Sequence, residues 1–430
     1  MQIHIVQSGD TLHKIATTYG ITIDAIVSTN ELPHPDRLVV GQALVIPIEG
    51  RIYIVQKGDS LWSIGQKFHI SYTELASYNQ IPIHFPLQIG MRLHIPPQPK
   101  EKKQTNAYVE PSGNTVSEFL RDHTTAIAPY LTYLSPFTYR VNEDGSLIAP
   151  PLQYFPKIAE VNNNVLVMVI SNLKDGAFNT QLASIILNNT AIQNQFISHI
   201  IAEAKRVGFG DIHFDFERIR LEDREAYNQF LRIARDRFHA EGLTISTALA
   251  PKTSANQPGE WYVGHDYKAH GEIVDYVVVM TYEWGYSGGP PMAVSPLPSV
   301  RQVLEYALTV IPAHKIMMGQ NLYGYDWTLP FVQGSTARAI SPQQAIEIAA
   351  NHHAAIQYDT TAQAPFFHYI SQDGKQHEVW FEDARSIQAK FDLMKELNLR
   401  GISYWKLGLS FPQNWLLLRD QFEIEKLRHS

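Results

Sequence analysis

Hydrophobic positions in the C-terminal three quarters of the chain fall into short apolar runs separated by amphipathic stretches of helix length. Runs without polar alternation, such as Val277 to Met280, are typical of parallel strands covered on both faces. We therefore predict an α/β domain over residues 107–430 that closes into a (β/α)8 barrel. The predicted strands are Ala126 to Tyr133, Val165 to Ile170, Asp211 to Phe216, Leu243 to Leu249, Val274 to Met280, Lys315 to Leu322 and Gly401 to Trp405.

The first hundred residues contain an internal repeat. The run Ile5 to Leu12 recurs as Ile54 to Leu61, and later positions follow at the same offset. Each copy predicts a short strand, two short helices and a final strand stopped by proline, which makes a small βααβ unit. Its Gly-Asp-Thr/Ser turn offers a hydroxyl or carboxylate that can cap the first helix. We place the units at residues 1–48 and 51–97.

The segment from Pro96 to Asn106, between the second unit and the barrel, is proline-rich at its start and charged after that, and we place the linker itself at residues 98–106. It carries almost no apolar side chain that could be buried. This composition predicts an interdomain linker.

One predicted strand alternates strictly between polar and apolar residues. Asp211, His213, Asp215 and Glu217 share one face, and Ile212, Phe214 and Phe216 share the other. A half-exposed antiparallel strand would leave the polar face in water. In a barrel the apolar face lies under helices instead, so the polar row points inward with Glu217 at the C-terminal mouth, where barrel active sites lie.

Crowded carboxylates cannot all ionise at low cost, so one is expected to keep a proton near neutral pH. A general acid for a glycosidic oxygen needs such a proton. Glu217, the last of the row, is the predicted acid, and Asp215 lies close enough to hydrogen-bond it or the substrate.

The segment Gly208 to Glu217 resembles the strand-four signature Asp-Gly-x-Asp/Asn-x-Asp-x-Glu of glycoside hydrolase family 18, the chitinase-like barrels. Met280 to Trp284 resembles the family's strand-six Met-x-Tyr element, and Gly319 to Trp327 its strand-seven segment. Tyr404-Trp405 resembles the strand-eight tryptophan that floors the sugar pocket. By the same resemblance, the segment from Tyr323 to Glu378 holds a reduced form of the family's inserted subdomain, which implies a shallower cleft.

The resemblance implies a retaining, substrate-assisted reaction. Glu217 would protonate the leaving oxygen, Asp215 would orient the substrate acetamido group, and Tyr282 would hydrogen-bond its carbonyl. A lone aromatic residue is more often a core residue, but its place at a strand end favours a sugar contact for Tyr282 and Trp405. The candidate catalytic residues are Glu217, Asp215, Tyr282, His213 and Asp211, and the candidate substrate-binding residues are Trp405, Trp284, Met280, Glu283, Asn321, Tyr323 and Trp327.

The strand-four signature departs from the family at two positions. Its leading Asp-Gly is Gly210-Asp211 here, and its inner Asp/Asn is His213. In the family the inner residue shares a proton with the middle aspartate. Either His213 or Asp211 is therefore expected to take that role.

The two N-terminal units resemble LysM domains, over Gln2 to Ile48 and Ile52 to Pro97. That resemblance implies binding of glycans that contain N-acetylglucosamine, and two weak sites on one chain raise retention on a polymer. The alternative reading is that the aspartates only cap helices and the asparagines only form turns. The predicted groove residues are Gly9, Asp10, Thr11, Leu12 and Asn30 in the first unit, and Gly58, Asp59, Ser60, Leu61 and Asn79 in the second.

Composition narrows the class of protein. Hydrophobic residues make up 44% and charged residues 18%, which is ordinary for a folded soluble protein. The net charge of -7 without any basic run argues against nucleic acid as a partner. No stretch has the length or hydropathy of a membrane span, and the N-terminus lacks the features of a signal peptide. We expect a monomer without a cofactor or metal ion; cysteine is absent, and His352-His353 has no partner at metal-ligand spacing.

The combination of two LysM-like units and this barrel resembles the spore cortex-lytic N-acetylglucosaminidases of endospore formers. That resemblance implies spore cortex peptidoglycan as the substrate and a location in the outer layers of the spore, with activity during germination. The first alternative is an enzyme that acts on chitin or chitooligosaccharides. The second is a non-catalytic chitinase-like lectin or coat protein, which would typically lack the acid or its partner, whereas Asp215, Glu217 and Tyr282 are all present.

Overall fold

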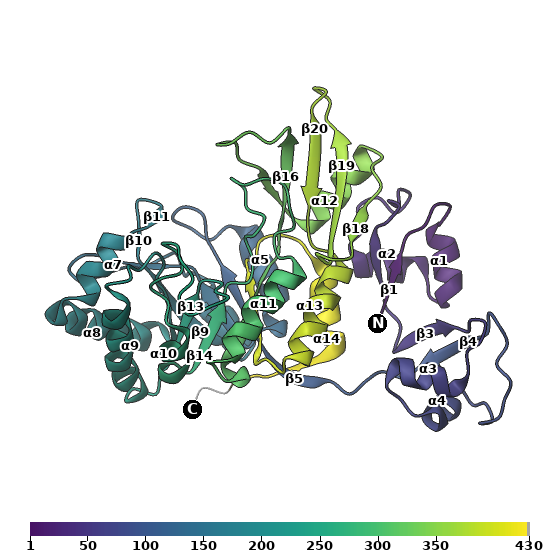
Figure 1. The fold of residues 1–430 in the computed structure, drawn as a ribbon, viewed down its shortest axis with the longest axis horizontal. Helices are drawn as coiled ribbons and strands as arrows, with labels where there is room; N and C mark the ends of the chain where they lie inside the picture. The colour runs from purple at the N-terminus through teal and green to yellow at the C-terminus, as the bar shows by residue number, and fades with distance from the viewer. Residues whose placement is uncertain (428–430) are drawn as a thin grey trace.

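A computed structural model describes residues 1–427 of the chain. Its centre is a closed barrel of eight parallel strands, and the pairing of β12 with β9 completes the ring (Figure 1). The predicted (β/α)8 barrel is therefore confirmed. In chain order the strands are β5 (Glu101–Val109), β6 (Tyr133–Pro136), β9 (Val165–Ser171), β12 (Asp211–Asp215), β13 (Thr244–Leu249), β14 (Tyr276–Val279), β15 (Ile316–Asn321) and β21 (Gly401–Trp405).

Helices between consecutive strands cover the outside of the barrel (Figure 1). They are α5 (Glu118–Ile127), α6 (Phe155–Val161), α7 (Thr180–Leu187), α8 (Thr190–Val207), α9 (Arg224–His239), α10 (Tyr267–Ile273), α11 (Leu297–Leu308) and α13 (Ala384–Glu396). After β21, α14 (Pro412–Gln421) leads into β22 (Phe422–Ile424), which pairs with the start of β5. Among residues 1–427, no helix is long and apolar enough to cross a membrane.

Shorter elements complete the barrel. Two hairpins follow β6 and β9, and short 3-10 helices precede β6 and β15. They are β7 (Tyr139–Val141) with β8 (Leu147–Ile148), β10 (Leu173–Lys174) with β11 (Ala177–Phe178), η1 (Ala128–Tyr130) and η2 (Ala313–Lys315).

The predicted insertion is a separate antiparallel sheet between β15 and α13, at the top of Figure 1. Its strand order is β17-β16-β20-β19-β18, and α12 (Pro342–Asn351) packs with it. The strands are β16 (Gly324–Leu329), β17 (Arg338–Ile340), β18 (Gln357–Asp359), β19 (Ala364–Ile370) and β20 (Gln376–Trp380). This sheet rises from the end of β15, so it flanks the mouth of the barrel.

The first barrel strand corrects one sequence prediction. The polar pattern predicts a linker over residues 98–106, but β5 already begins at Glu101. Its polar side chains from Lys103 to Asn106 are buried and find partners: Lys103 Nζ donates to the Leu399 carbonyl oxygen at 2.9 Å, and Asn106 Nδ2 donates to Ser403 Oγ at 2.9 Å. Because hydrogen bonds satisfy these groups, the strand can be buried without an apolar pattern.

The predicted strand from Ala126 to Tyr133 is wrong. Its first residues end α5, and the next turn is η1, which contains Pro129. Proline cannot donate a backbone hydrogen bond to a sheet. The buried residues Leu120, Thr124 and Ile127 recur at helical spacing, which explains why the helix continues.

Both predicted βααβ units are confirmed, and we call residues 1–48 copy one and residues 51–97 copy two. In each copy the two strands pair antiparallel, and a hydroxyl caps the first helix. Copy one contains β1 (Gln2–Ile5), α1 (Leu12–Tyr19), α2 (Ile23–Asn30) and β2 (Ala43–Ile46), and copy two contains β3 (Arg51–Ile54), α3 (Leu61–Phe68), α4 (Tyr72–Tyr78) and β4 (Arg92–Ile95).

Copy one packs tightly against the catalytic domain through the loop before β2. Val39 is buried in a cluster with residues of the insertion, and the Ile356 N–H donates to the Val40 carbonyl oxygen at 2.8 Å. Arg385 Nη2 on α13 donates to the Gly41 carbonyl oxygen at 3.0 Å. In Figure 1 this copy lies beside β18 and α13. The loop therefore contacts both the inserted sheet and helix α13.

Copy two contacts its neighbours less and exposes more apolar surface. Gln2 of copy one joins it through two hydrogen bonds to the Ile52 backbone, of 2.9 and 3.2 Å. Its exposed large apolar side chains are Ile54, Trp62, Tyr72, Tyr78, Ile83, Phe85 and Ile89, whereas copy one exposes only Ile23 and Val40 of this kind. The two copies share a fold, but their surfaces differ.

Gly41→Ala is expected to loosen copy one from the catalytic domain, because the added methyl group would collide with the Ile356 carbonyl oxygen. Gly90→Ala is the matched control, since both glycines have φ of 84° but a methyl group on Gly90 meets no atom within 4 Å. Both variants bear left-handed strain of about 1–2 kcal/mol. We expect a larger radius of gyration by X-ray scattering and a lower Tm for Gly41→Ala. Equal values for the two variants would contradict the docking.

Candidate active site

The alternating strand β12 divides its side chains as predicted. Phe214 packs against Phe230 of α9 with ring centroids 5.2 Å apart, and Ile212 and Phe216 are also buried in the core under the helices. On the other face, Asp211, His213 and Asp215 are buried inside the barrel. The apolar face thus fixes the direction of the polar face, and Glu217 follows at the C-terminal mouth.

Three neighbours hold Glu217 at that mouth. The indole Nε1–H of Trp261 donates to Glu217 Oε2 at 2.5 Å. The Asn172 amide pairs with the Glu217 backbone in both directions, at 2.9 and 3.0 Å. Burial and the charge of Asp215 raise the pKa of the Glu217 carboxyl well above its usual range, whereas the Trp261 hydrogen bond lowers it. A carboxyl group in this setting keeps its proton near neutral pH.

Asp215 lies two residues before Glu217, deeper in the barrel. Its carboxyl is buried, and within residues 1–427 its Oδ1 has no hydrogen-bond partner. Burial raises the pKa of this carboxyl as well. Asp215 and Glu217 therefore form a pair that does not readily carry two negative charges.

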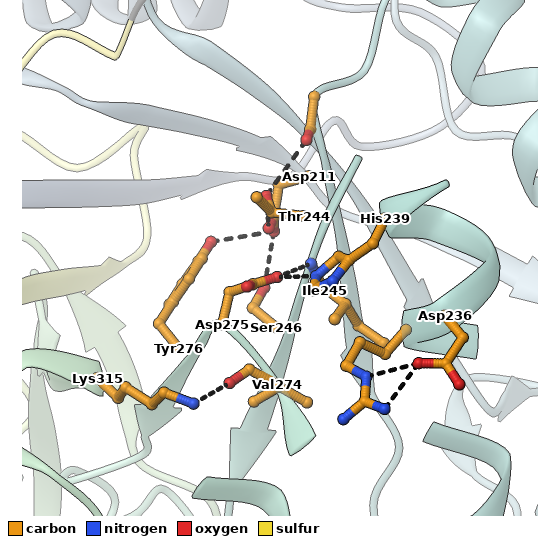
Figure 2. A network of polar contacts seen from close by, with 12 residues as sticks. Asp211, Asp236, His239, Thr244, Ile245, Ser246, Val274, Asp275, Tyr276 and Lys315 are labelled. Atoms are coloured by element: carbon orange, nitrogen blue, oxygen red, sulfur yellow. Dashed lines mark hydrogen bonds and ion pairs between the residues drawn. The ribbon is translucent and has the colours of Figure 1, made fainter. Parts of the chain in front are cut away.

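Below Asp215, His213 and Asp211 belong to a hydrogen-bonded network, and Figure 2 shows its lower end around Asp211. His213 Nε2 lies 2.8 Å from the Tyr108 hydroxyl, and His213 Nδ1 lies 2.8 Å from Ser246 Oγ. Ser246 donates to Asp211 Oδ2 at 2.7 Å, and the Tyr276 hydroxyl donates to the same oxygen at 3.0 Å. Burial raises the pKa of Asp211 to about 6 and lowers the pKa of His213 to about 3.

A cavity of about 500 Å³ lies above this network. Its lining brings together seven of the predicted site residues: Asp215, Glu217, Met280, Tyr282, Glu283, Tyr323 and Trp405. Trp405 packs edge-on against Phe137, with centroids 4.8 Å apart. Glu283 accepts hydrogen bonds from the hydroxyls of Tyr323 and Tyr325. The carboxyl groups of Asp215 and Glu217 thus face a space lined by aromatic rings, which suits a sugar.

The structure places the other predicted residues outside the cavity lining. Asp211 and His213 lie beneath it, as described above. Trp284 packs against the main core, and Trp327 is buried with its Nε1–H donating to the Gly289 carbonyl oxygen at 2.8 Å. Asn321 donates to the Tyr323 carbonyl oxygen at 2.7 Å. Trp284 is therefore a core contact, whereas Trp327 and Asn321 contact the lining residues Tyr325 and Tyr323.

Several lining residues are missing from the sequence prediction, among them Tyr108, Phe137, Trp261 and Tyr325. Tyr108 belongs to the strand that the polar pattern concealed, and Phe137 follows β6, whose position was also mispredicted. Trp261 lies in the loop after β13. A tryptophan that follows the end of a predicted barrel strand is the signal that could have identified it.

The predicted groove residues of the LysM-like units have structural partners. Thr11 and Ser60 cap helices by accepting from the Lys14 and Ser63 backbone at 3.2 and 3.0 Å, so hydroxyls and not carboxylates are the caps. Asp10 and Asp59 instead accept from backbone N–H groups within the preceding turns, at 2.8 and 2.7 Å. The aspartates therefore brace the turns.

Other predicted groove residues differ in exposure. Asn30 is buried and Asn79 half-buried, and each ties α2 or α4 to the final strand of its copy. Leu12 and Leu61 are core residues. Gly9 and Gly58 are exposed, and an added methyl group at either would meet no atom within 4 Å. Within residues 1–427, no three His, Asp or Glu side chains are grouped so that they could hold a metal ion.

Residues 105–409 match the glycosyl hydrolases of family 18, and residues 4–47 and 53–96 each match the LysM domain. The chain therefore belongs to glycoside hydrolase family 18, and it is a glycosidase with two N-terminal LysM domains. Both family resemblances predicted from the sequence are confirmed.

Individual relatives narrow this class. The chain is 66% identical over 427 residues to the cortical fragment-lytic enzyme of Bacillus subtilis (strain 168), which covers 99% of each protein. It is 52% identical to the spore cortex-lytic enzyme SleL of Bacillus megaterium QM B1551, whose crystal structure superimposes with a TM-score of 0.93 over 99% of both chains. A chitinase of Chromobacterium violaceum ATCC 12472, at 23% identity, has a TM-score of 0.68 over 74% of this chain and 98% of its own and shares the fold.

Trp261→Phe is expected to move the alkaline limb of the kcat/KM profile to higher pH. The lost N–H stabilises the ionised Glu217, so its removal raises the pKa of the acid, and the protonated form persists to higher pH. A shift of roughly one pH unit is expected. Trp284→Phe, outside the cavity lining, should leave the limb in place. A limb that stays fixed or moves to lower pH in Trp261→Phe would contradict this assignment.

Proposed function

We propose that this enzyme hydrolyses the glycan strands of spore cortex peptidoglycan and cleaves the bond that follows N-acetylglucosamine. The match to the cortical fragment-lytic enzyme along almost the whole of both chains is the observation that carries the proposal. The match includes both LysM domains, so the catalytic barrel and its glycan-binding modules occur in the same arrangement. The proposed location is the outer layers of the spore, and the proposed form is a monomer.

Glu217 is the proposed general acid and base. Its raised pKa and its place at the barrel mouth suit a group that protonates the leaving glycosidic oxygen. The acetamido carbonyl of the bound sugar then attacks the anomeric carbon, and a cyclic oxazolinium ion forms as the glycosidic bond breaks. Water later opens this ring, with Glu217 taking the water proton. The configuration at the anomeric carbon is thereby retained.

Asp215 and Tyr282 are the proposed partners of the acetamido group. Asp215 lines the cavity next to Glu217 and has a free buried oxygen that can accept the acetamido N–H. Its negative charge would stabilise the oxazolinium ion. Tyr282 also lines the cavity, and its hydroxyl can donate to the carbonyl oxygen before the attack. Trp405 offers the aromatic face on which a pyranose ring can stack.

Copy two is the proposed principal glycan-binding module. Trp62 follows its Gly-Asp-Ser turn and is 63% exposed, and Ile83 and Phe85 are exposed in the loop opposite. The aligned positions in copy one are His13, His34 and Asp36, and the end of the same loop is packed against the catalytic domain. Both walls of the copy-two groove therefore offer apolar surface to sugar rings.

Glu217→Gln is expected to reduce the release of cortex fragments by about 10²- to 10⁴-fold, because the amide cannot donate an acid proton. Mass spectrometry of products from purified cortex peptidoglycan checks this, and the wild type should release fragments with N-acetylglucosamine at the reducing end. Glu160→Gln, at an exposed helical position, is the control and should match the wild type. Silence of the wild type on cortex, with release from chitooligosaccharides, would favour a chitinase. Silence on both, with binding retained, would favour a lectin.

Trp62→Ala is expected to weaken retention on cortex peptidoglycan by about tenfold, the loss of roughly one aromatic contact. Co-sedimentation with insoluble cortex measures the bound fraction. His13→Ala removes the aligned side chain of copy one and should change retention much less. Equal losses in the two variants would show that the copies contribute alike.

A further inference from the structure

The hydrogen-bonded chain of Tyr108, His213, Ser246 and Asp211 inside the barrel is called the polar column here. Asp211, at its lower end, fixes which group donates in each hydrogen bond. Asp211 Oδ1 accepts from Thr244 Oγ1 at 2.5 Å, and Asp211 Oδ2 accepts from Ser246 and Tyr276 (Figure 2). A carboxylate has no proton to give, so the Ser246 hydroxyl must donate to it. Ser246 Oγ is then left as an acceptor on its other side.

The direction passes from Ser246 to His213. Because Ser246 Oγ can only accept from the imidazole, His213 must carry its proton on Nδ1, which lies 2.8 Å away. In the neutral ring Nε2 is then an acceptor, so the Tyr108 hydroxyl, also 2.8 Å away, must donate to it. Burial lowers the pKa of the imidazole to about 3, which keeps the ring neutral. Every donor in the column therefore points away from the cavity.

The column ends beneath the catalytic pair. Tyr108 lines the cavity, and Asp215 is the charge that acts most strongly on its hydroxyl. With its proton turned down to His213, Tyr108 offers Asp215 only a lone pair. The buried oxygen Asp215 Oδ1 has no donor among residues 1–427.

We infer that Asp211, Ser246 and His213 are positioning residues that hold the Tyr108 proton away from the cavity, so that Asp215 remains an unsatisfied acceptor for a substrate N–H. This inference rests on the proposed function for its substrate, but the column itself is independent of it. The sequence left open whether His213 or Asp211 takes the place of the inner aspartate that shares a proton with Asp215. In this column Asp211 supplies the charge and His213 transmits its direction, and neither shares a proton with Asp215.

Other charged and titratable groups around the column are few. The side chains of Asp275, Tyr133 and Arg400 act on Asp211 or on Tyr276 beside it, and Arg400 lies over the Tyr276 ring at 4.9 Å. Asp275 accepts from His239 Nε2 at 2.9 Å and from the Ile245 N–H at 2.8 Å, outside the column (Figure 2). At the upper end, Ser403 on β21 accepts from Asn106 Nδ2 at 2.9 Å. The side chains of Asp215, Glu217 and Tyr282 act on Tyr108 there, and Tyr227 and Tyr282 act on Asp215.

The His213 tautomer tests the inference directly. In the full-length protein labelled with ¹⁵N-histidine, the resonance lost in His213→Gln identifies the ring. We expect a neutral imidazole protonated on Nδ1. A proton on Nε2, or a charged ring at neutral pH, would overturn the inference. This readout needs no substrate, so it separates failure of the column from failure of the proposed function.

Two variants test the effect on catalysis. Asp211→Asn removes the charge that directs the column, and Ser246→Ala breaks it in the middle. Either change lets the Tyr108 hydroxyl turn the positive end of its dipole toward Asp215, whose charge already acts on it. A positive end directed at a carboxylate stabilises the charged form and lowers the pKa of that carboxyl. The acidic limb of kcat/KM, where Asp215 becomes protonated, should then move to lower pH by roughly one unit.

The matched control is Asp275→Asn, which removes a carboxylate from the same layer of the barrel but not from the column. It should keep the wild-type acidic limb even if its Tm falls. The inference is wrong if Asp211→Asn and Ser246→Ala, both folded by circular dichroism, have the same limb as Asp275→Asn. A merely structural role would lower Tm and kcat without moving the limb.

Discussion

Removing a carboxylate from water costs several kcal/mol unless hydrogen bonds or opposite charges replace the water. β12 and the residues after it place Asp211, Asp215 and Glu217 inside or at the mouth of a closed barrel. The lower carboxylate is fully supplied with donors from β13 and β14, whereas the upper pair is not. Because the number of hydrogen-bond donors differs, Asp211 stays ionised, whereas Asp215 and Glu217 hold protons more strongly. The other strands of the barrel exclude water from all three carboxyl groups.

The same constraint explains why the interior polarity is spread over several strands. Asn106 on β5 bonds Ser403 on β21, and Ser135 Oγ on β6 donates to Asn106 Oδ1 at 2.6 Å. Tyr108 of β5 reaches His213 of β12 across the barrel. A barrel lined only by aliphatic residues could not accept the charged row of one strand. The buried polar groups therefore form a connected network, which specifies how the strands face one another.

The sequence was informative where burial leaves a periodic signal. Most barrel strands, both βααβ units and the orientation of the Asp211 to Glu217 row follow from apolar runs, repetition and alternation. The first strand did not, because its buried Lys103 donates to the carbonyl oxygen of a distant loop and lies 3.4 Å from the Glu101 carboxylate. Trp261 was missed for a related reason: a loop has no period, and only the closed barrel brings this side chain to Glu217. Local patterns carry register and face, whereas contacts between distant loops depend on the assembled fold.

Because copy one is docked on the catalytic domain, its sequence is more constrained than that of copy two. The loop of Val39 to Gly41 must keep its hydrogen bond within copy one, from the Gly41 N–H to the Val6 carbonyl oxygen at 2.8 Å, and must also fit the surface formed by Ile356 and Arg385. In the matching loop of copy two, the Gly90 N–H donates to the Val55 carbonyl oxygen of the same copy, and a methyl group on Gly90 would meet no atom within 4 Å. The repeated segment thus meets two sets of packing requirements in copy one and a single set in copy two. A surface with fewer packing requirements tolerates more substitutions, so copy two is the module with more freedom to adapt to a new glycan.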